Sequence, residues 1–145
     1  MQVLTPGMRP RGGMLGVNRF RVAPNHAAIP FHAHQLEDEV LVIETGRGVF
    51  RYGDEPVREV VAGDCIVCPA GAGKAHQLAN ASADEELVYL AIGAFEPQEV
   101  CTYPDTGKVL IRGLGRTIGR VAECDYMDGE PDMPRILDLA REQLG

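Results

Sequence analysis

Apolar and polar positions alternate in short blocks along most of the chain. Runs rich in β-branched and apolar residues are interrupted by glycine, proline and aspartate roughly every eight to twelve residues, which is typical of a sandwich or barrel. The runs that predict strands are residues 15–22, 40–43, 49–52, 57–62, 65–68, 76–79 and 87–94. We therefore predict an all-β fold in which 15–22 is a first edge strand.

The segments between these runs predict how the strands are connected. Residues 45–48 (Thr-Gly-Arg-Gly) have turn chemistry and lie between strands 40–43 and 49–52, so we expect these two strands to form a hairpin. Residues 96–129 are rich in glycine, proline and charge, and only 109–112 and 120–124 have the pattern of strands there.

The last residues of the chain have a helical pattern instead. Asp132 is a suitable N-cap, and Pro134 lies within the first turn that would follow it. The apolar residues that repeat at helical spacing are Met133, Ile136, Leu137, Ala140 and Leu144. We predict one short C-terminal helix at about 133–143, packed on a barrel whose core covers about 15–125, so that residues 1–145 form a single domain.

The composition fits a globular domain without a nucleic-acid or membrane partner. The chain has 145 residues, of which 45% are hydrophobic and 24% are charged, values close to those of globular proteins. Its net charge is -7 and its basic residues are scattered, which argues against binding to nucleic acid or to an anionic membrane. No apolar run reaches the length of a signal peptide or a membrane span, so we expect a cytoplasmic protein.

The four cysteines are expected to be reduced in that compartment. Cys65 and Cys68 have the spacing of a zinc knuckle or a redox pair. They lie in a predicted strand, however, and side chains three positions apart on a strand point to opposite faces. We therefore favour a structural role for both.

Three of the four histidines and one glutamate are candidates for a metal site. His32 and His34 are two positions apart, so on a strand both imidazoles project from one face and can reach a single ion. Glu39 opens the next strand, and if it faces the same way as Leu41 its carboxylate can approach the two imidazoles. His76 begins a separate strand, which a barrel can bring close to the others.

A cluster of this kind can also be explained without a metal. Buried imidazoles and a carboxylate would then need a fully satisfied hydrogen-bond network. The fourth histidine, His26, lies in an irregular segment between two prolines, where it could be a fifth ligand, an acid or base, or a residue outside the site.

The spacing of these residues resembles the two conserved motifs of the cupin family. His32-x-His34, four residues, Glu39, six residues and Gly46 match the first motif, although His26 stands where that motif usually opens with a glycine. Gly63, five residues, Pro69, then Gly71 or Gly73, His76, three residues and Asn80 resemble the second motif, with two extra residues before the histidine. The resemblance covers residues 30–80 and implies a jelly-roll β-barrel.

The C-terminal part resembles a subgroup of small bacterial cupins of undetermined function. The resemblance rests on residues 103–109 and 125–130, and Met127 stands where a tryptophan is expected. Residues 104–107 also fit an ordinary turn with Lys108 in solvent, whereas a functional reading places Tyr103 or Lys108 near the mouth of the barrel. Tyr103 is therefore a second candidate, beside His26, for a catalytic role.

Three neutral imidazoles and one carboxylate would hold one divalent transition metal ion, which could be iron, manganese, zinc or nickel. The net charge of about +1 and two open positions favour a chelating, oxygen-rich ligand. Glu37 and Asp38 disfavour a strongly anionic substrate, unless they instead orient the histidines.

We expect a metal-dependent dioxygenase, isomerase or lyase acting on a small oxygen-rich metabolite. The alternatives are a non-catalytic module that binds a sugar or another metabolite, and a metal-free structural barrel. The resemblance to small cupins also implies a homodimer, in which a second copy covers the edge strand.

Overall fold

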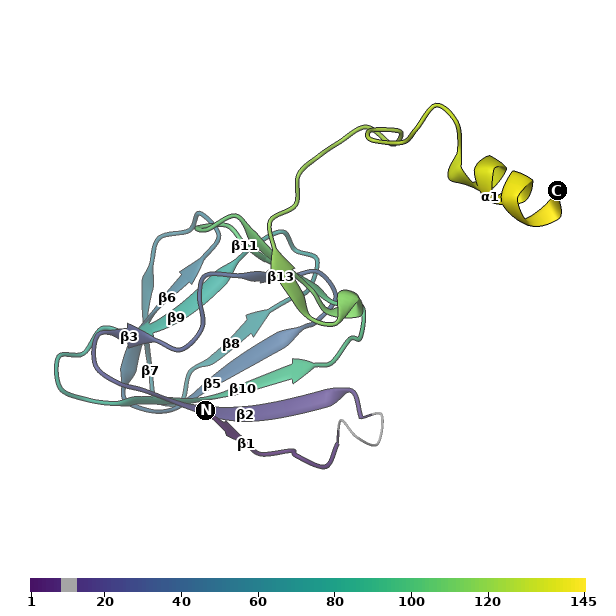
Figure 1. Cartoon of the computed structure of the whole chain (residues 1–145). Helices are drawn as coiled ribbons and strands as arrows, with labels where there is room; N and C mark the ends of the chain where they lie inside the picture. The colour runs from purple at the N-terminus through teal and green to yellow at the C-terminus, as the bar shows by residue number, and fades with distance from the viewer. Residues whose placement is uncertain (9–12) are drawn as a thin grey trace.

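Three antiparallel sheets form from short strands in the computed structural model, which describes residues 1–8 and 13–145 (Figure 1). The first sheet has the order β1 (Gln2–Val3), β2 (Leu15–Val22), β10 (Leu87–Ala94), β5 (Glu39–Thr45) and β8 (Cys65–Cys68). The second has the order β3 (His26–Ala27), β9 (His76–Asn80), β6 (Arg47–Tyr52) and β7 (Arg58–Val61). The third has the order β13 (Thr117–Gly119), β12 (Lys108–Ile111), β11 (Val100–Tyr103) and β4 (Ala33–His34).

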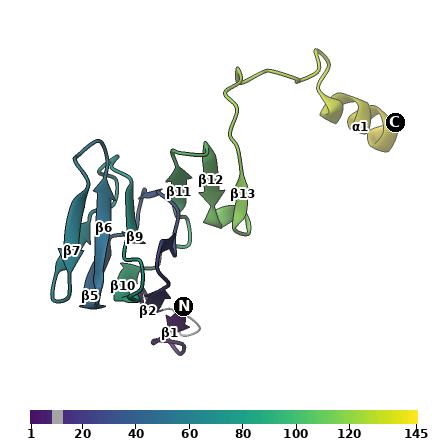
Figure 2. The ribbon, with the colours of Figure 1, turned by 90° about the vertical axis from the view of Figure 1, so that its left-hand side faces the viewer.

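One apolar core joins the first two sheets. Alternate residues of β5, β6, β9 and β10 point inward, and the side chains of Ile43, Phe50 and Leu87 are at most 2% exposed. Figure 2 shows β6, β7 and β9 on one side of the molecule and β11, β12 and β13 on the other. The all-β jelly-roll fold predicted from the sequence is confirmed.

The predicted hairpin between residues 40–43 and 49–52 is wrong. β5 pairs with β10 and β8, whereas β6 pairs with β9 and β7, so the turn at Gly46 carries the chain from one sheet to another. Gly46 has a φ of 83°, and a Cβ added there would lie 2.5 Å from the carbonyl oxygen of Glu86. Glycine is needed because this corner combines a left-handed backbone with close contact to another segment.

Two further strand predictions need correction. Residues 15–22 form β2 as predicted, but β2 is not an edge strand, because β1 pairs with it at Arg19 and Asn18. Residues 120–124 form no strand. β13 ends at Gly119, which pairs with Val109. Because β12 begins at Lys108, only one residue before Val109, it offers almost no strand residues for the chain after Gly119 to pair with.

The C-terminal helix exists, but the prediction that it packs on the barrel is wrong. Helix α1 (Arg135–Leu144) has no buried residue, and Figure 1 shows it at the end of an extended segment that leads away from the sheets. The N-cap is Pro134 rather than Asp132. A proline disfavours helical geometry in the residue before it, which keeps Met133 out of the helix.

No helix formed by residues 1–8 or 13–145 has the length and hydropathy that a membrane crossing requires.

Candidate metal centre

Backbone pairing brings His32 and His76 together. The N–H of each residue donates to the carbonyl of the other, at 3.1 Å from His32 and 2.7 Å from His76. This antiparallel bridge connects the chain just before β4 to the start of β9, and the centroids of the two imidazole rings are 4.4 Å apart. His34 lies two residues further along, and its ring centroid is 4.9 Å from that of His32.

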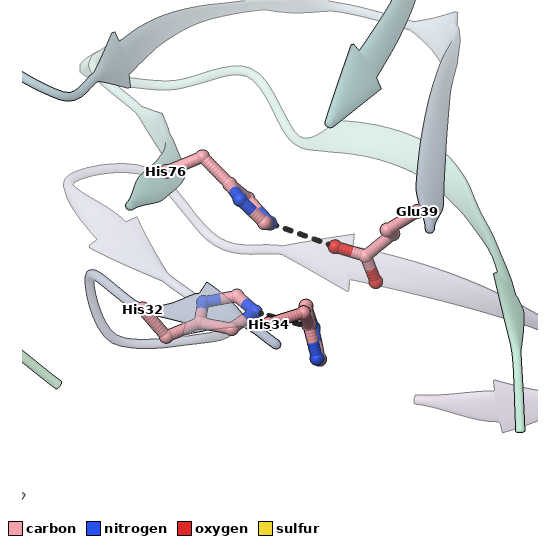
Figure 3. Close-up of side chains that lie close together, drawn as sticks. All are labelled: His32, His34, Glu39 and His76. Carbon is pink, nitrogen blue, oxygen red and sulfur yellow. Dashed lines mark hydrogen bonds and ion pairs between the residues drawn. The ribbon is translucent and has the colours of Figure 1, made fainter. Parts of the chain in front are cut away.

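Glu39 reaches the histidines from the first residue of β5. It has the same parity as Leu41 and Ile43, whose side chains are in the core, and both Glu39 and Leu41 line the same cavity. Its Oε2 atom accepts a hydrogen bond from Nε2 of His76 at 2.9 Å. The structure therefore brings together all four residues that the sequence selected as ligands, and Figure 3 shows their side chains pointing toward one another.

The separations of the four donor atoms suit a single ion. All four lie within 4.8 Å of one another, and Nε2 of His32 is 3.2 Å from Nε2 of His34. With metal–ligand bonds of about 2.1 Å, neighbouring octahedral ligands are separated by about 3.0 Å and opposite ones by about 4.2 Å. The two short contacts in the cluster, 3.2 Å and 2.9 Å, match neighbouring ligands.

The hydrogen-bond pattern of the imidazoles gives a second argument for a cation. Nδ1 of His32 lies 2.8 Å from the carbonyl oxygen of Pro30, which can only accept, so in a neutral ring the proton is on Nδ1 and Nε2 has a free lone pair. Nδ1 of His34 is buried without a hydrogen-bond partner among the described residues, and the nearest carboxylate oxygens, of Glu99 and Glu37, are 3.5 Å and 3.7 Å away. In the tautomer that carries the His34 proton on Nδ1, two lone pairs face each other at 3.2 Å, and a cation between them would relieve the repulsion.

Burial favours the neutral imidazole that a metal requires. Burial, reinforced by the neighbouring charge of His76 and opposed by the hydrogen bond to Pro30, lowers the pKa of His32 from 6.5 to about 4. Burial alone would raise the pKa of Glu39, but the hydrogen bond and charge of His76 outweigh it and keep this pKa below its ordinary value. The cluster thus combines a neutral donor with an ionised carboxylate near neutral pH.

Metal-free protein is expected to lose stability as the pH falls from 7 to 5. The unfolded chain protonates His32 near pH 6.5, whereas the folded chain does so only near pH 4, so acid favours the unfolded state across this window. We expect His32 to contribute about 2 kcal/mol to this loss. Urea unfolding of chelator-treated wild type and His32→Gln at both pH values measures it. Equal pH dependence of the two proteins would contradict the buried, neutral state of His32.

Two buried glutamates, Glu99 and Glu37, lie close to Nδ1 of His34. Glu99 is fully buried and accepts hydrogen bonds from the backbone N–H groups of Gln35 at 2.8 Å and Leu36 at 2.9 Å. Its Oε1 atom lies 3.5 Å from Nδ1 of His34, and Oε2 of Glu37 lies 3.7 Å from the same atom. These carboxylates face the outer nitrogen of a candidate ligand, which is how metal-binding histidines are commonly oriented.

Sequence reasoning identified Glu37 as a possible orienting residue but missed Glu99. Glu99 immediately precedes β11, in a segment where no strand was predicted. A local signal for a strand was present, namely a pattern with a period of two. Glu99, Cys101 and Tyr103 lie on one side of the strand, and Glu99 and Cys101 are buried. Asp38 does not orient a histidine, since its Oδ1 accepts the N–H of Ala70 instead.

A cavity of about 220 Å³ opens beside the four candidate ligands. Apolar side chains such as Phe20, Leu41 and Tyr89 form part of its wall, while polar groups include Asn18 and Gln77. Sites for drug-sized ligands usually measure about 300 to 1,000 Å³, so this cavity fits a smaller molecule.

The structure places the two weaker catalytic candidates differently. Tyr103 lines the cavity, and burial raises the pKa of its phenol to about 12, so the group is protonated at neutral pH. Its ring is stacked on that of His32 with the centroids 6.2 Å apart. His26 is exposed on β3, donates from Nδ1 to the carbonyl of Pro24, and does not line the cavity.

The cysteines of the described segments are all free. Cys65 is exposed and Cys68 is buried, as expected for positions on opposite faces of β8. Burial raises the pKa of the Cys68 thiol to about 12. No cysteine of the described residues belongs to a group of possible metal ligands.

Residues 18–93 match the family model described as a cupin domain. This segment includes all four candidate ligands and ends within β10. A comparison with curated proteins gives no significant match.

Solved structures of similar fold come from several bacteria. A protein from Silicibacter pomeroyi, described as a sugar phosphate isomerase from a cupin superfamily, is 27% identical, with a TM-score of 0.70 over 83% of this chain and 73% of that one. A protein from Acidithiobacillus ferrooxidans, described provisionally as a sugar phosphate isomerase, is 25% identical, with a TM-score of 0.69 over 78% and 71%. A Cupin 2 conserved barrel domain protein from Salinispora arenicola is 28% identical, with a TM-score of 0.52 over 63% and 71%.

Proposed function

The chain belongs to the cupin family, and from this premise we propose that it is a metal-dependent isomerase acting on a small sugar or sugar phosphate. The observation that carries the proposal is the convergence of three imidazoles and one carboxylate at the wall of a small cavity. The choice of an isomerase, rather than a dioxygenase or lyase, is supported by the similarity to the protein described as a sugar phosphate isomerase.

The proposed ligands are His32, His34, Glu39 and His76, for one ion of iron, manganese, zinc or nickel. When bound, such an ion would polarise the carbonyl and adjacent hydroxyl oxygens of a substrate. Tyr103, protonated at neutral pH, can donate a hydrogen bond to a substrate oxygen in the cavity.

One observation favours the alternative of a non-catalytic binding module. Among the described residues that line the cavity, no carboxylate or imidazole is present beyond the four proposed ligands. Isomerisation moves a proton between carbon atoms and needs a base for that step. A binding protein would need only the ion and the polar wall.

Removal and replacement of the metal is the experiment that separates these functions. Protein stripped with a chelator and reloaded with one metal at a time would be incubated with aldose and ketose phosphates in D₂O. We expect NMR to show interconversion, with deuterium entering the product, only in loaded protein. Loaded protein that gains thermal stability from a sugar but returns it unchanged would instead support the binding module.

The homodimer and the cytoplasmic location stay predictions from the sequence. Light scattering at micromolar concentration tests the first, because a monomer there would contradict the dimer.

A further inference from the structure

Two arginines line the cavity, but one of them is already neutralised. Both guanidinium Nη atoms of Arg112 bind the carboxylate of Glu37, with Nη2 at 3.0 Å from Oε2. Nη1 of Arg112 also donates to the carbonyl of Glu96 at 2.7 Å. Its charge and donors are therefore committed to the protein, and it is a poor partner for a ligand.

Arg116 lines the same cavity and is not neutralised. Its side chain forms no ion pair in the described part of the chain, and the residue is exposed. It also borders, together with Asn18, a second hollow of about 280 Å³ beside the N-terminal residues. Burial raises the pKa of Tyr103 to about 12 and the positive charge of Arg116 partly offsets this, as expected for two neighbours at one cavity.

The backbone holds Arg116 there at a conformational cost. The 3₁₀ helix η2 (Arg112–Leu114) is followed by two successive left-handed residues, Gly115 with a φ of 70° and Arg116 with a φ of 61°. The N–H of Arg116 closes this turn on the carbonyl of Arg112 at 3.1 Å. An arginine in this conformation is uncommon, and such outliers concentrate at functional sites.

We propose that Arg116 binds the phosphate group of the substrate. This inference rests on the proposed function and narrows its substrate to a small phosphorylated sugar. The histidine cluster and Arg116 line the same cavity, so the cluster would take carbonyl and hydroxyl oxygens of the substrate while Arg116 supplies an unpaired cation. A guanidinium binds phosphate through two parallel, charge-assisted hydrogen bonds.

The acidic residues that argued against an anionic substrate do not oppose this arrangement. Glu37 is paired with Arg112, and Asp38 does not line the cavity that Arg116 borders. Of the acidic residues, the cavity wall contains only Glu39, a proposed metal ligand, among the residues described. The overall charge of -7 is largely screened beyond about 8 Å at physiological salt.

Calorimetric titration with inorganic phosphate, glycerol 3-phosphate and glycerol tests the proposal on the full chain, both metal-loaded and metal-stripped. We expect both phosphates to bind wild type at millimolar concentrations and glycerol not to bind. Arg116→Gln should weaken phosphate binding to metal-stripped protein by about 10-fold or more. Arg120→Gln removes the same charge from an exposed residue outside the cavity and should leave the affinity within about 2-fold.

A second variant separates the guanidinium from the backbone. Arg116→Gly fits the left-handed conformation, so it should keep the fold and lose phosphate binding as Arg116→Gln does. The inference is overturned if wild type does not bind phosphate, if Arg116→Gly still binds it, or if Arg116→Gln and Arg120→Gln behave alike. Phosphate binding that depends on Arg116 without any isomerisation supports the inference and contradicts the proposed function.

Discussion

Replacement of His34 by alanine is expected to abolish metal binding and metal-dependent activity while leaving the barrel folded. The substitution removes one of three nitrogen donors and also the group that connects the cluster to Glu99. Loss of an outer partner alone costs about 10- to 100-fold in metal affinity, so loss of a ligand should cost at least about 100-fold. The fold should survive, because the His34 side chain lines the cavity and is not part of the apolar core.

Elemental analysis of purified protein measures this effect, together with titration of the chelator-treated protein with zinc or manganese. His26→Ala is the matched control, since it removes an exposed imidazole from β3 outside the cluster. Near-stoichiometric metal is expected in wild type and His26→Ala. Equal metal content in His34→Ala would show that the cluster is not the metal site.

Substitution of Glu99 should have the second largest effect, and glutamine and alanine should act differently. Glu99→Gln keeps the size of the side chain but weakens the acceptor that faces Nδ1 of His34, so we expect metal affinity to fall by about 10- to 100-fold. Glu99→Ala also removes the acceptor of the Leu36 N–H, while the Gln35 N–H keeps the carbonyl of Val100 at 3.2 Å. That should lower the free energy of unfolding by about 1 to 3 kcal/mol.

Metal titration measures the contribution of Glu99 to metal affinity, and urea unfolding measures its contribution to stability. Glu96→Gln provides the control, because it changes a nearby glutamate that does not face a histidine. A Glu99→Gln variant with wild-type metal affinity would show that Glu99 only holds the chain near Gln35 and does not position His34.

The strands that could be predicted correctly are those with a strong local signal. Residues 15–22, 65–68 and 87–94 are continuous apolar or alternating runs between turn residues, and they form β2, β8 and β10 with the predicted bounds. The hairpin at Gly46 was wrong because a turn signal shows that the chain changes direction but not which strand it then joins. The helix pattern likewise shows an apolar face without specifying its partner.

The candidate site, like the strands, could be predicted only where the signal is local in the sequence. His32, His34, Glu39 and His76 were found because strand parity and motif spacing are local properties of the sequence. Glu99 was missed although a period of two was present, because only the pairing of β11 with the two-residue strand β4 brings it to His34. Arg116 was missed because it is the second of two left-handed residues in a turn that has no simple sequence signature.

The proposed ligands come from strands of all three sheets: His34 lies on β4, Glu39 on β5 and His76 on β9. An ion held by these residues would act as a reversible cross-link between segments that are far apart in the chain. Folding and metal loading would then be one linked equilibrium, with about 2.7 kcal/mol added to the stability when free metal is 100-fold above its dissociation constant. The amount of folded protein in a cell would thereby follow the local supply of the metal.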